Sequence, residues 1–363
     1  MVSKLLSLST LLGLTLGAAI PNNNGFPMPN DQQKLEIAHE AGGLLPGGPA
    51  PASLGANSIT AFQLIAFNEL FETAYFSSLL HNITSEAPGY HAENKEELVK
   101  IFSTVLAQEE QHALAAVSTL KAVNAFAPSA CQYQFPVSNL KDAVNLAETF
   151  TAVVLGALQG ANVIFSQDSQ AGAIRTVSSV IGQEGEQNGF YRVFLDKVPS
   201  ESPFLTAVPA PFAWSALQGF VVPNSCPYPV SNINLPIFPP LAVNGGAIAS
   251  LEPYDQTLSF TADLSSSEAA KAYIGKDNLF LTYTTGQQLP VSLGITDVKW
   301  DASKISFKAA FPYSKYVMQG FSHAALTTSN TFDSADAVVQ SALAAPGLIQ
   351  QIGDVYGVLA VQD

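Results

Sequence analysis

Residues 108–112 of this chain read Gln-Glu-Glu-Gln-His and interrupt a long, mostly apolar segment with helical periodicity. Glu109 and His112 are three positions apart, so they share one face of a helix. Polar side chains inside an apolar helix are costly unless they are paired or bind a ligand. The pattern therefore predicts that Glu109 and His112 point into a helical bundle as metal ligands. The alternative is a surface pair beside Glu110 and Gln111.

Three other long apolar segments carry isolated carboxylates in the same way. We expect helices over residues 58–81, 94–126, 139–166 and 171–195. Helices of this length are typical of a bundle. The carboxylates that are expected to face its interior are Glu69, Glu109, Glu148 and Glu184. Two alternatives stay open, because Glu69 with its neighbour Glu72 could form a solvated edge and Glu148 could belong to a solvent-facing stripe.

The arrangement matches the requirements of a metal site in a bundle core. A site for two ions takes a Glu from each of two helices and a Glu-x-x-His pair from each of the other two. Glu109 and His112 supply one such pair, whereas the fourth segment offers Glu184 and Gln187. An amide oxygen binds transition metals more weakly than an imidazole does. Carboxylates with imidazole suit iron or manganese, so the sequence predicts an Fe or Mn site that is either dinuclear or mononuclear.

These helices and carboxylates resemble a known family. Residues 58 to about 225 resemble the ferritin-like four-helix bundle, and the whole chain resembles secreted fungal proteins of the stress-response or late-sexual-development type. The resemblance implies an up-down-down-up bundle with one long crossover and a di-iron or di-manganese centre. Gln187 occupies the sixth ligand position, where the family has histidine. The ligands that the resemblance carries over to the other positions are Glu69, Glu109, His112, Glu148 and Glu184.

The chain divides into segments of different composition. We expect a signal peptide (1–19), an extended lead-in (20–57), the ferritin-like bundle (58–235) and a β-rich domain (236–363). The lead-in is rich in Pro, Gly and Asn, and the last domain contains short β-branched or aromatic runs separated by turn residues. The Ala-rich last thirty residues read as a possible helix. The predicted fold class is α+β, with a helical bundle followed by a small sandwich-like β domain.

The amino terminus and the cysteines indicate secretion. Lys4, an apolar run and small residues ending at Ala19 form a signal-peptide pattern that is too short to span a membrane, and no other span is expected. Cys131 and Cys226 lie in Pro- and Ser-rich loops, where an oxidising compartment would join them; two unpaired thiols are the alternative. Asn82 begins the sequon Asn-Ile-Thr and predicts N-glycosylation.

Composition narrows the function. The 363 residues carry a net charge of −14, which leaves no basic surface for nucleic acid, and their apolar share of 47% excludes a disordered chain. Our first hypothesis is a secreted ferritin-like protein whose Fe or Mn site reacts with oxygen or peroxide. The second is a non-enzymatic structural or interaction protein of the cell surface or wall, with a degenerate metal site and cell-wall components as partners. Whether the chain is an enzyme stays open at this point.

Overall fold

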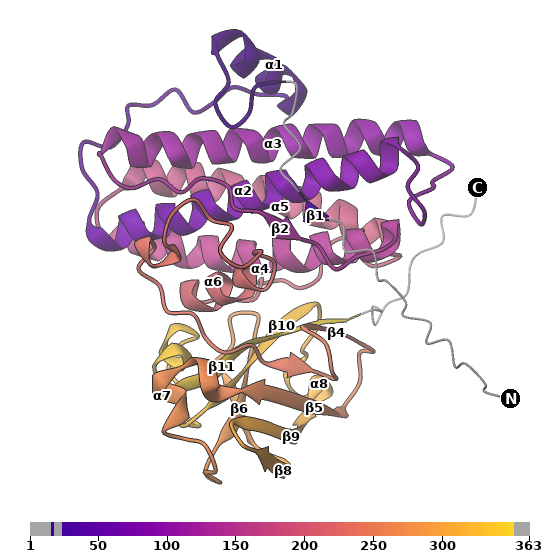
Figure 1. Cartoon of the computed structure of the whole chain (residues 1–363), viewed down its shortest axis with the longest axis vertical. Coiled ribbons are helices and arrows are strands. Elements are labelled where there is room, and N and C mark those ends of the chain that lie inside the picture. Colours follow the sequence, from indigo (N-terminus) through magenta and orange to yellow (C-terminus); the bar gives the residue numbers. More distant parts are fainter. Residues whose placement is uncertain (1–15, 18–23, 352–363) are drawn as a thin grey trace, which may run out of the picture.

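The computed structural model describes residues 16–17 and 24–351 and consists of a bundle of long helices above a β-rich part (Figure 1). The predicted signal peptide, residues 1–19, lies outside the described residues except for Leu16–Gly17 (β1), which pairs with Tyr133–Gln134 (β2). The helices of the bundle part are α1 (Asp31–Ala41), α2 (Ala56–Thr84), α3 (Lys95–Ala122), α4 (Leu140–Gln167), α5 (Ala171–Phe194) and α6 (Ala210–Gln218).

The four long helices expected from the sequence are present as α2 to α5, with ends within four residues of the predicted ones. At the start of α4, a local sequence signal explains where the helix begins. Asn139 precedes α4, and its side chain accepts a hydrogen bond from the backbone of Asp142, as expected of an N-cap residue. Helix α4 is the one described helix that is long and apolar enough to cross a membrane. Most of it is buried inside the protein, as befits a core helix.

Contacts between α2 and α4 show the direction of the helices. Phe62, near the start of α2, packs against Phe165, near the end of α4, with ring centroids 4.6 Å apart. Tyr75, later in α2, donates a hydrogen bond to the carbonyl of Ala143, near the start of α4. The two helices are therefore antiparallel. Because the α2–α3 and α4–α5 connections are short and residues 123–139 form a long crossover, the order is up-down-down-up.

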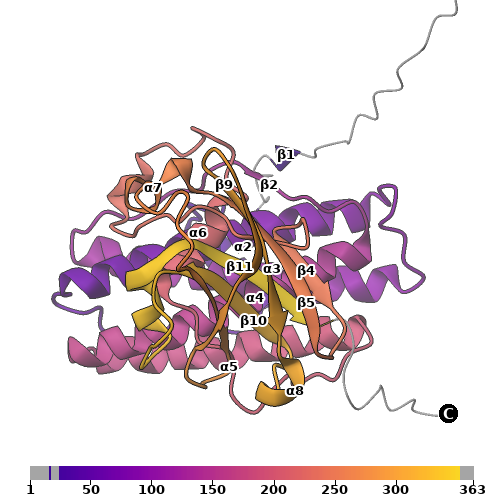
Figure 2. The ribbon, with the colours of Figure 1, turned by 90° about the horizontal axis from the view of Figure 1, so that it is seen from below.

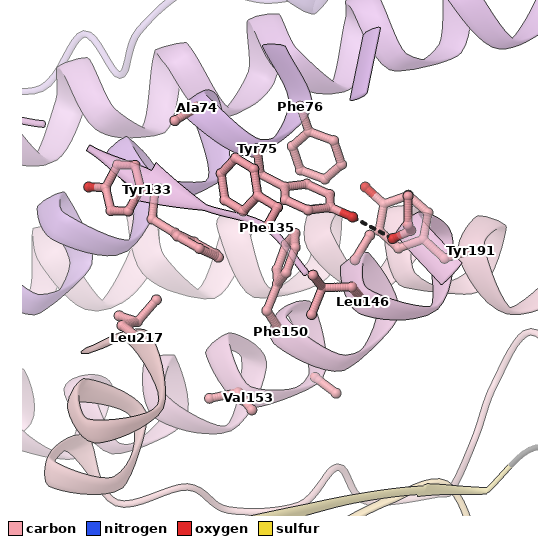
Figure 3. Packing of buried hydrophobic residues seen from close by; sticks show 14 of the residues in the cluster. Ala74, Tyr75, Phe76, Tyr133, Phe135, Leu146, Phe150, Val153, Tyr191 and Leu217 are labelled. Carbon is pink, nitrogen blue, oxygen red and sulfur yellow. Dashed lines mark hydrogen bonds between the residues drawn. The ribbon is translucent and has the colours of Figure 1, made fainter. Parts of the chain in front are cut away.

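Aromatic side chains fill the centre of the bundle. The ring of Tyr75 meets the rings of Phe135 and Phe150 edge-on, with centroids 4.9 and 4.8 Å away, and Figure 3 shows these side chains gathered between the helices. Tyr191 on α5 and Phe76 on α2 continue this cluster, with stacked rings 6.1 Å apart. Such packing holds α2, α4 and α5 together around the polar residues of the site.

The lead-in is not extended throughout, so the prediction for residues 20–57 is wrong over the eleven residues of α1. Asn30 and Gln33 form a reciprocal capping box that starts this helix. Helix α1 packs on α3. Asn24, just before it, donates to the buried carboxylate of Glu110 on α3. The Pro- and Gly-rich composition on either side favours an extended segment. The Asn-x-x-Gln spacing was the sequence pattern that indicated this short helix.

The β-rich part begins with β3 and forms two sheets. The five-stranded sheet has the order β4 (Ile248–Leu251), β11 (Ala342–Gln351), β10 (Phe321–Thr327), β6 (Phe280–Thr285) and β7 (Val291–Gly294). The four-stranded sheet has the order β3 (Ala242–Val243), β5 (Gln256–Asp263), β9 (Lys304–Phe311) and β8 (Thr296–Asp301). The turn η1 (Val230–Asn232) precedes β3. Short helical turns within this part are η2 (Leu264–Ser266), α7 (Glu268–Lys271), α8 (Tyr313–Tyr316) and η3 (Asp336–Ser341).

The sheets share one apolar core, to which Phe260 and Phe307 contribute from one sheet and Tyr283 from the other. Within residues 242–351, all strand pairs are antiparallel except β4 with β11. This arrangement confirms the predicted α+β class, with a helical bundle followed by a β-rich part.

The five-stranded sheet also packs against the bundle. Phe321 on β10 and Leu348 on β11 belong to the same apolar cluster as the helices, and Figure 2 shows β10 and β11 lying across the bundle. Strand β11 is buried along almost its whole length because both faces are covered. Its sequence therefore lacks the alternation of a half-buried strand. The prediction of a helix at the Ala-rich end is therefore wrong over residues 342–351.

Cys131 and Cys226 form a disulfide, as predicted, and lie 95 positions apart in the sequence. The bond joins the crossover before α4 to the segment that follows α6. Asn82 lies in the last turns of α2 and is half-buried, and its glycosylation stays a prediction.

Candidate metal centre

Four of the predicted ligands come together from three helices. Glu69 comes from α2, Glu109 and His112 from α3, and Glu184 from α5. Each offers one ligand atom, and these four atoms all lie within 4.8 Å of one another. The spacing of Glu109 and His112 on one helix face, read from the sequence, is what places this pair in the bundle interior.

The imidazole of His112 faces three carboxylates. Its Nδ1 lies 2.9 Å from Oε2 of Glu109, 3.5 Å from Oε2 of Glu69 and 3.8 Å from Oε1 of Glu184. A cation beside this nitrogen is thus within reach of all four side chains. The side chain of His112 keeps 14% of its surface exposed, whereas the three carboxylates are buried.

Two of the buried carboxylates have no hydrogen-bond donor. Neither oxygen of Glu69 or of Glu184 accepts a hydrogen bond. Burial raises the pKa of Glu69 to about 7 and the pKa of Glu184 well above its usual value. For His112, burial acts to lower the pKa, but the carboxylates of Glu109 and Glu69 raise it well above the ordinary value. Buried charges of one sign are costly unless a cation compensates them.

A fourth carboxylate, Glu72, lies nearby. It is 2% exposed, and one of its oxygens has no hydrogen-bond partner. Burial raises its pKa, and the charges of Glu109, Glu184 and Glu69 raise it further. The structure excludes the alternative that Glu69 and Glu72 form a solvated edge. The three-residue spacing from Glu69, which places Glu72 on the same face, was the sequence signal for its position.

Gln187 lies beside the cluster and binds one of its carboxylates. Its Nε2 donates to Oε1 of Glu109 over 2.7 Å and to Oε1 of Gln108 over 3.1 Å. Its own Oε1 accepts from the hydroxyl of Tyr191 at 3.4 Å. The amide nitrogen, which cannot ligate a cation, is the atom that faces the site. Gln187 therefore orients Glu109, and the Glu-x-x-Gln spacing was the only sequence pattern that pointed to this contact.

The structure does not bring Glu148 to the other ligands. Its Oε1 accepts from Nη1 of Arg192 at 2.8 Å, and its Oε2 accepts from Nζ of Lys197 at 2.7 Å. All three residues are buried. The prediction that Glu148 joins the cluster is wrong, because these two cations neutralise its carboxylate. Glu148 is the only Glu on α4, so this helix supplies no Glu to the site. An Arg in the last turn of α5 and a Lys three residues after the helix were the available signal.

Three carboxylates and one imidazole make a hard, oxygen-rich ligand set that suits a transition metal such as Fe or Mn. The residues present therefore fit a metal ion. The groups that could complete a second position, Glu148 and Gln187, are engaged in other contacts.

Comparison with known proteins agrees with this geometry. Residues 59–197 match the family model of the ferritin-like domain, and these residues include every predicted metal ligand and the four long helices apart from the first three residues of α2. Curated proteins provide no match to the chain. The helical part is thus a ferritin-like domain that carries a buried cluster of carboxylates and histidine, and the β-rich part lies outside the matched residues.

Proposed function

We propose that the ferritin-like domain binds one Fe or Mn ion between Glu69, Glu109, His112 and Glu184. One observation carries this proposal: the buried oxygens of Glu69 and Glu184 accept no hydrogen bond while they face the same nitrogen of His112. A folded protein rarely leaves buried carboxylates unsatisfied. A bound cation satisfies them and lowers the cost of burying like charges together.

The contacts favour a mononuclear site over a dinuclear one. Arg192 and Lys197 neutralise Glu148, and Gln187 turns an amide nitrogen toward Glu109. Two of the six ligands of a dinuclear centre are therefore not offered. Glu72 is a further buried carboxyl group beside the site, and the charges of Glu109, Glu184 and Glu69 disfavour its ionisation, so a cation there would lower the cost of ionising all four groups.

When bound, Fe or Mn would supply one-electron chemistry with oxygen or peroxide. The chain holds the ion, keeps the ligands apart from bulk water and orients them. Gln187 orients Glu109 from outside the ligand set, as hydrogen-bonding partners of metal ligands commonly do. Secretion, and a role in stress or development, remain part of this proposal and rest on the amino-terminal pattern and the resemblance described above.

Oxidation of bound iron tests the proposal. The metal-free protein is loaded with Fe(II) without oxygen and then exposed to oxygen or peroxide, while Fe(III) absorbance is followed. We expect wild type to bind and oxidise iron and Glu184→Gln to bind none. Glu186→Gln is a matched control, because Glu186 is exposed and lies two residues away on the same helix. Oxidation by wild type no faster than that of free iron would refute the redox proposal.

A second candidate is a non-enzymatic protein of the cell surface or wall that retains the bundle as a scaffold. The observations in its favour are the contacts of Gln187 and Glu148, which remove two ligands from a dinuclear site. This alternative predicts that purified wild type takes up no Fe or Mn and that neither ion raises its melting temperature. It further predicts binding to isolated cell-wall material.

A further inference from the structure

A narrow cavity of about 40 Å³ runs along the bundle beside the metal centre. Helices α2, α4 and α6 form its walls, and Ile248 and Leu348 close it from the β-rich part. Its lining extends along α4 from Leu146 to Ile164, about 27 Å of helix. Phe150, which Figure 3 labels in the aromatic cluster, belongs to this wall near the site.

The wall of the cavity is almost entirely apolar. Small side chains such as Ala157, Ala213 and Ala216 leave the space that larger residues would fill. The volume exceeds the roughly 10–15 Å³ that one water needs, but a water also requires two to four polar partners. Along most of its length the cavity offers none. Apolar cavities of this kind stay dry and take up apolar atoms and small molecules such as xenon.

Three of the lining residues are polar, namely Asn68, Glu69 and Thr149. The hydroxyl of Thr149 donates to the carbonyl of Asn145, whereas none of the side-chain nitrogen or oxygen atoms of Asn68 and Glu69 has a hydrogen-bond partner. Asn68 is 5% exposed and Glu69 is fully buried. Ile164 and Ala210, which also line the cavity, are half-buried. The cavity therefore connects a half-buried apolar rim to one of the carboxylates that hold the metal in our proposal.

We propose that this cavity binds a small apolar gas and is the route by which dioxygen reaches the Glu69 side of the metal centre. The identification of the gas as dioxygen rests on the proposed function, whereas the affinity of the cavity for an apolar gas does not. A gas molecule loses little hydration on entering a dry cavity, while ions and polar molecules would lose hydrogen bonds that the wall does not replace.

Polar reactants have a different approach. A groove of about 450 Å³ between α3 and α5 is lined by Glu97, Lys100 and Thr104 and reaches Gln187. Gln187 in turn contacts Glu109. Hydrogen peroxide can therefore approach the site without entering the apolar cavity, which gives the test an internal comparison between two oxidants.

The first test does not depend on metal. Crystals of the full chain are pressurised with xenon, and we expect xenon density in the cavity near Ala157 and Ala216. Both residues are half-buried, so Ala157→Leu and Ala216→Leu fill the space with little strain elsewhere, and these variants should lose the xenon. Ala122→Leu, at the exposed end of α3, adds the same carbons outside the cavity and should keep it. A wild-type cavity without xenon would overturn the proposal.

The second test uses the iron-loaded protein. Ala157→Leu should lower the rate of Fe(II) oxidation by dioxygen about tenfold, equivalent to about 1.4 kcal/mol of added barrier, and should leave the rate with peroxide and the iron affinity unchanged. Equal rates with dioxygen in wild type and in a variant that has lost xenon would overturn the route. If wild type binds no iron or oxidises none, the proposed function fails and the route with it, and xenon uptake alone decides whether the cavity binds an apolar gas.

Discussion

Two buried glutamates of this bundle are predicted to respond to the same substitution in opposite directions. Glu69 is buried without a hydrogen-bond donor, whereas Glu148 is buried between Arg192 and Lys197. In the metal-free protein, the cost of burying the Glu69 carboxylate outweighs its attraction to His112, whose Nδ1 lies 3.5 Å away, so Glu69→Gln removes a charge that is unfavourable on balance. We therefore expect Glu69→Gln to stabilise the metal-free fold at neutral pH while it abolishes metal binding.

The size of this effect follows from the pKa of Glu69. Burial raises that pKa from 4.5 to about 7. Each pKa unit corresponds to about 1.4 kcal/mol, so the ionised side chain costs the metal-free fold up to about 3 kcal/mol above pH 7. The sign follows from the raised value. Below pH 4.5 Glu69 is protonated in both the folded and the unfolded chain, and the penalty disappears. It grows as the pH rises from 4.5 to 7.

Urea unfolding in the presence of a chelator measures this prediction. The free energy of unfolding of Glu69→Gln should exceed that of wild type by up to about 3 kcal/mol at pH 8 and by almost nothing at pH 4.5. Glu148→Gln is the matched control, because it leaves Arg192 and Lys197 without their partner and should cost about 3–5 kcal/mol. A Glu69→Gln variant that is less stable than wild type at pH 8 would refute the reasoning. So would a difference in the free energy of unfolding that does not change with pH.

The remaining predictions concern the orientation of a ligand, acid stability and the disulfide. Gln187→Leu should weaken Fe(II) or Mn(II) binding about 10- to 100-fold in a calorimetric titration, whereas Gln183→Leu, which does not touch a ligand, should leave it unchanged. Burial lowers the pKa of His323 to about 4, so the folded protein resists a proton that the unfolded chain takes up below pH 6.5. Wild type should therefore lose up to about 3 kcal/mol more stability than His323→Gln between pH 7 and pH 4, measured by urea unfolding; equal losses would contradict this. Replacing Cys131 and Cys226 by serine should cost about 4–5 kcal/mol in the loop-entropy model and leave metal binding intact.

The bundle was predictable because its signal is long and periodic. Four segments of more than twenty residues, each with apolar periodicity, allow little else than long packed helices. The Glu109 and His112 pair was predictable for the same reason, since a spacing of three residues on a helix determines a shared face. Helix geometry alone therefore located most of the candidate site.

The position of Glu148 was not predictable in this way. Its side chain lies in an apolar stretch, as a ligand would, but a buried carboxylate is satisfied equally well by a cation of the chain. Arg192 and Lys197 are more than forty residues away in the sequence, and only the tertiary structure brings them to Glu148. The contact of Gln187 with Glu109 is likewise a tertiary contact between two helices.

Strand β11 shows a different limit. Alternation of apolar and polar residues indicates a strand only when one face is solvated. Both faces of β11 are covered, by the bundle and by the second sheet, so an Ala-rich run that contains a strand resembles one that contains a helix.

The metal content of the protein tests the central claim most directly. Metal-free wild type is dialysed to equilibrium against Fe(II) or Mn(II), and the bound metal is counted by mass spectrometry beside a variant with Glu109→Gln and His112→Ala and the Glu186→Gln control. We predict near-stoichiometric metal in wild type and in the control, and none in the double variant, with all three proteins folded. A folded wild type that retains neither metal would contradict the account.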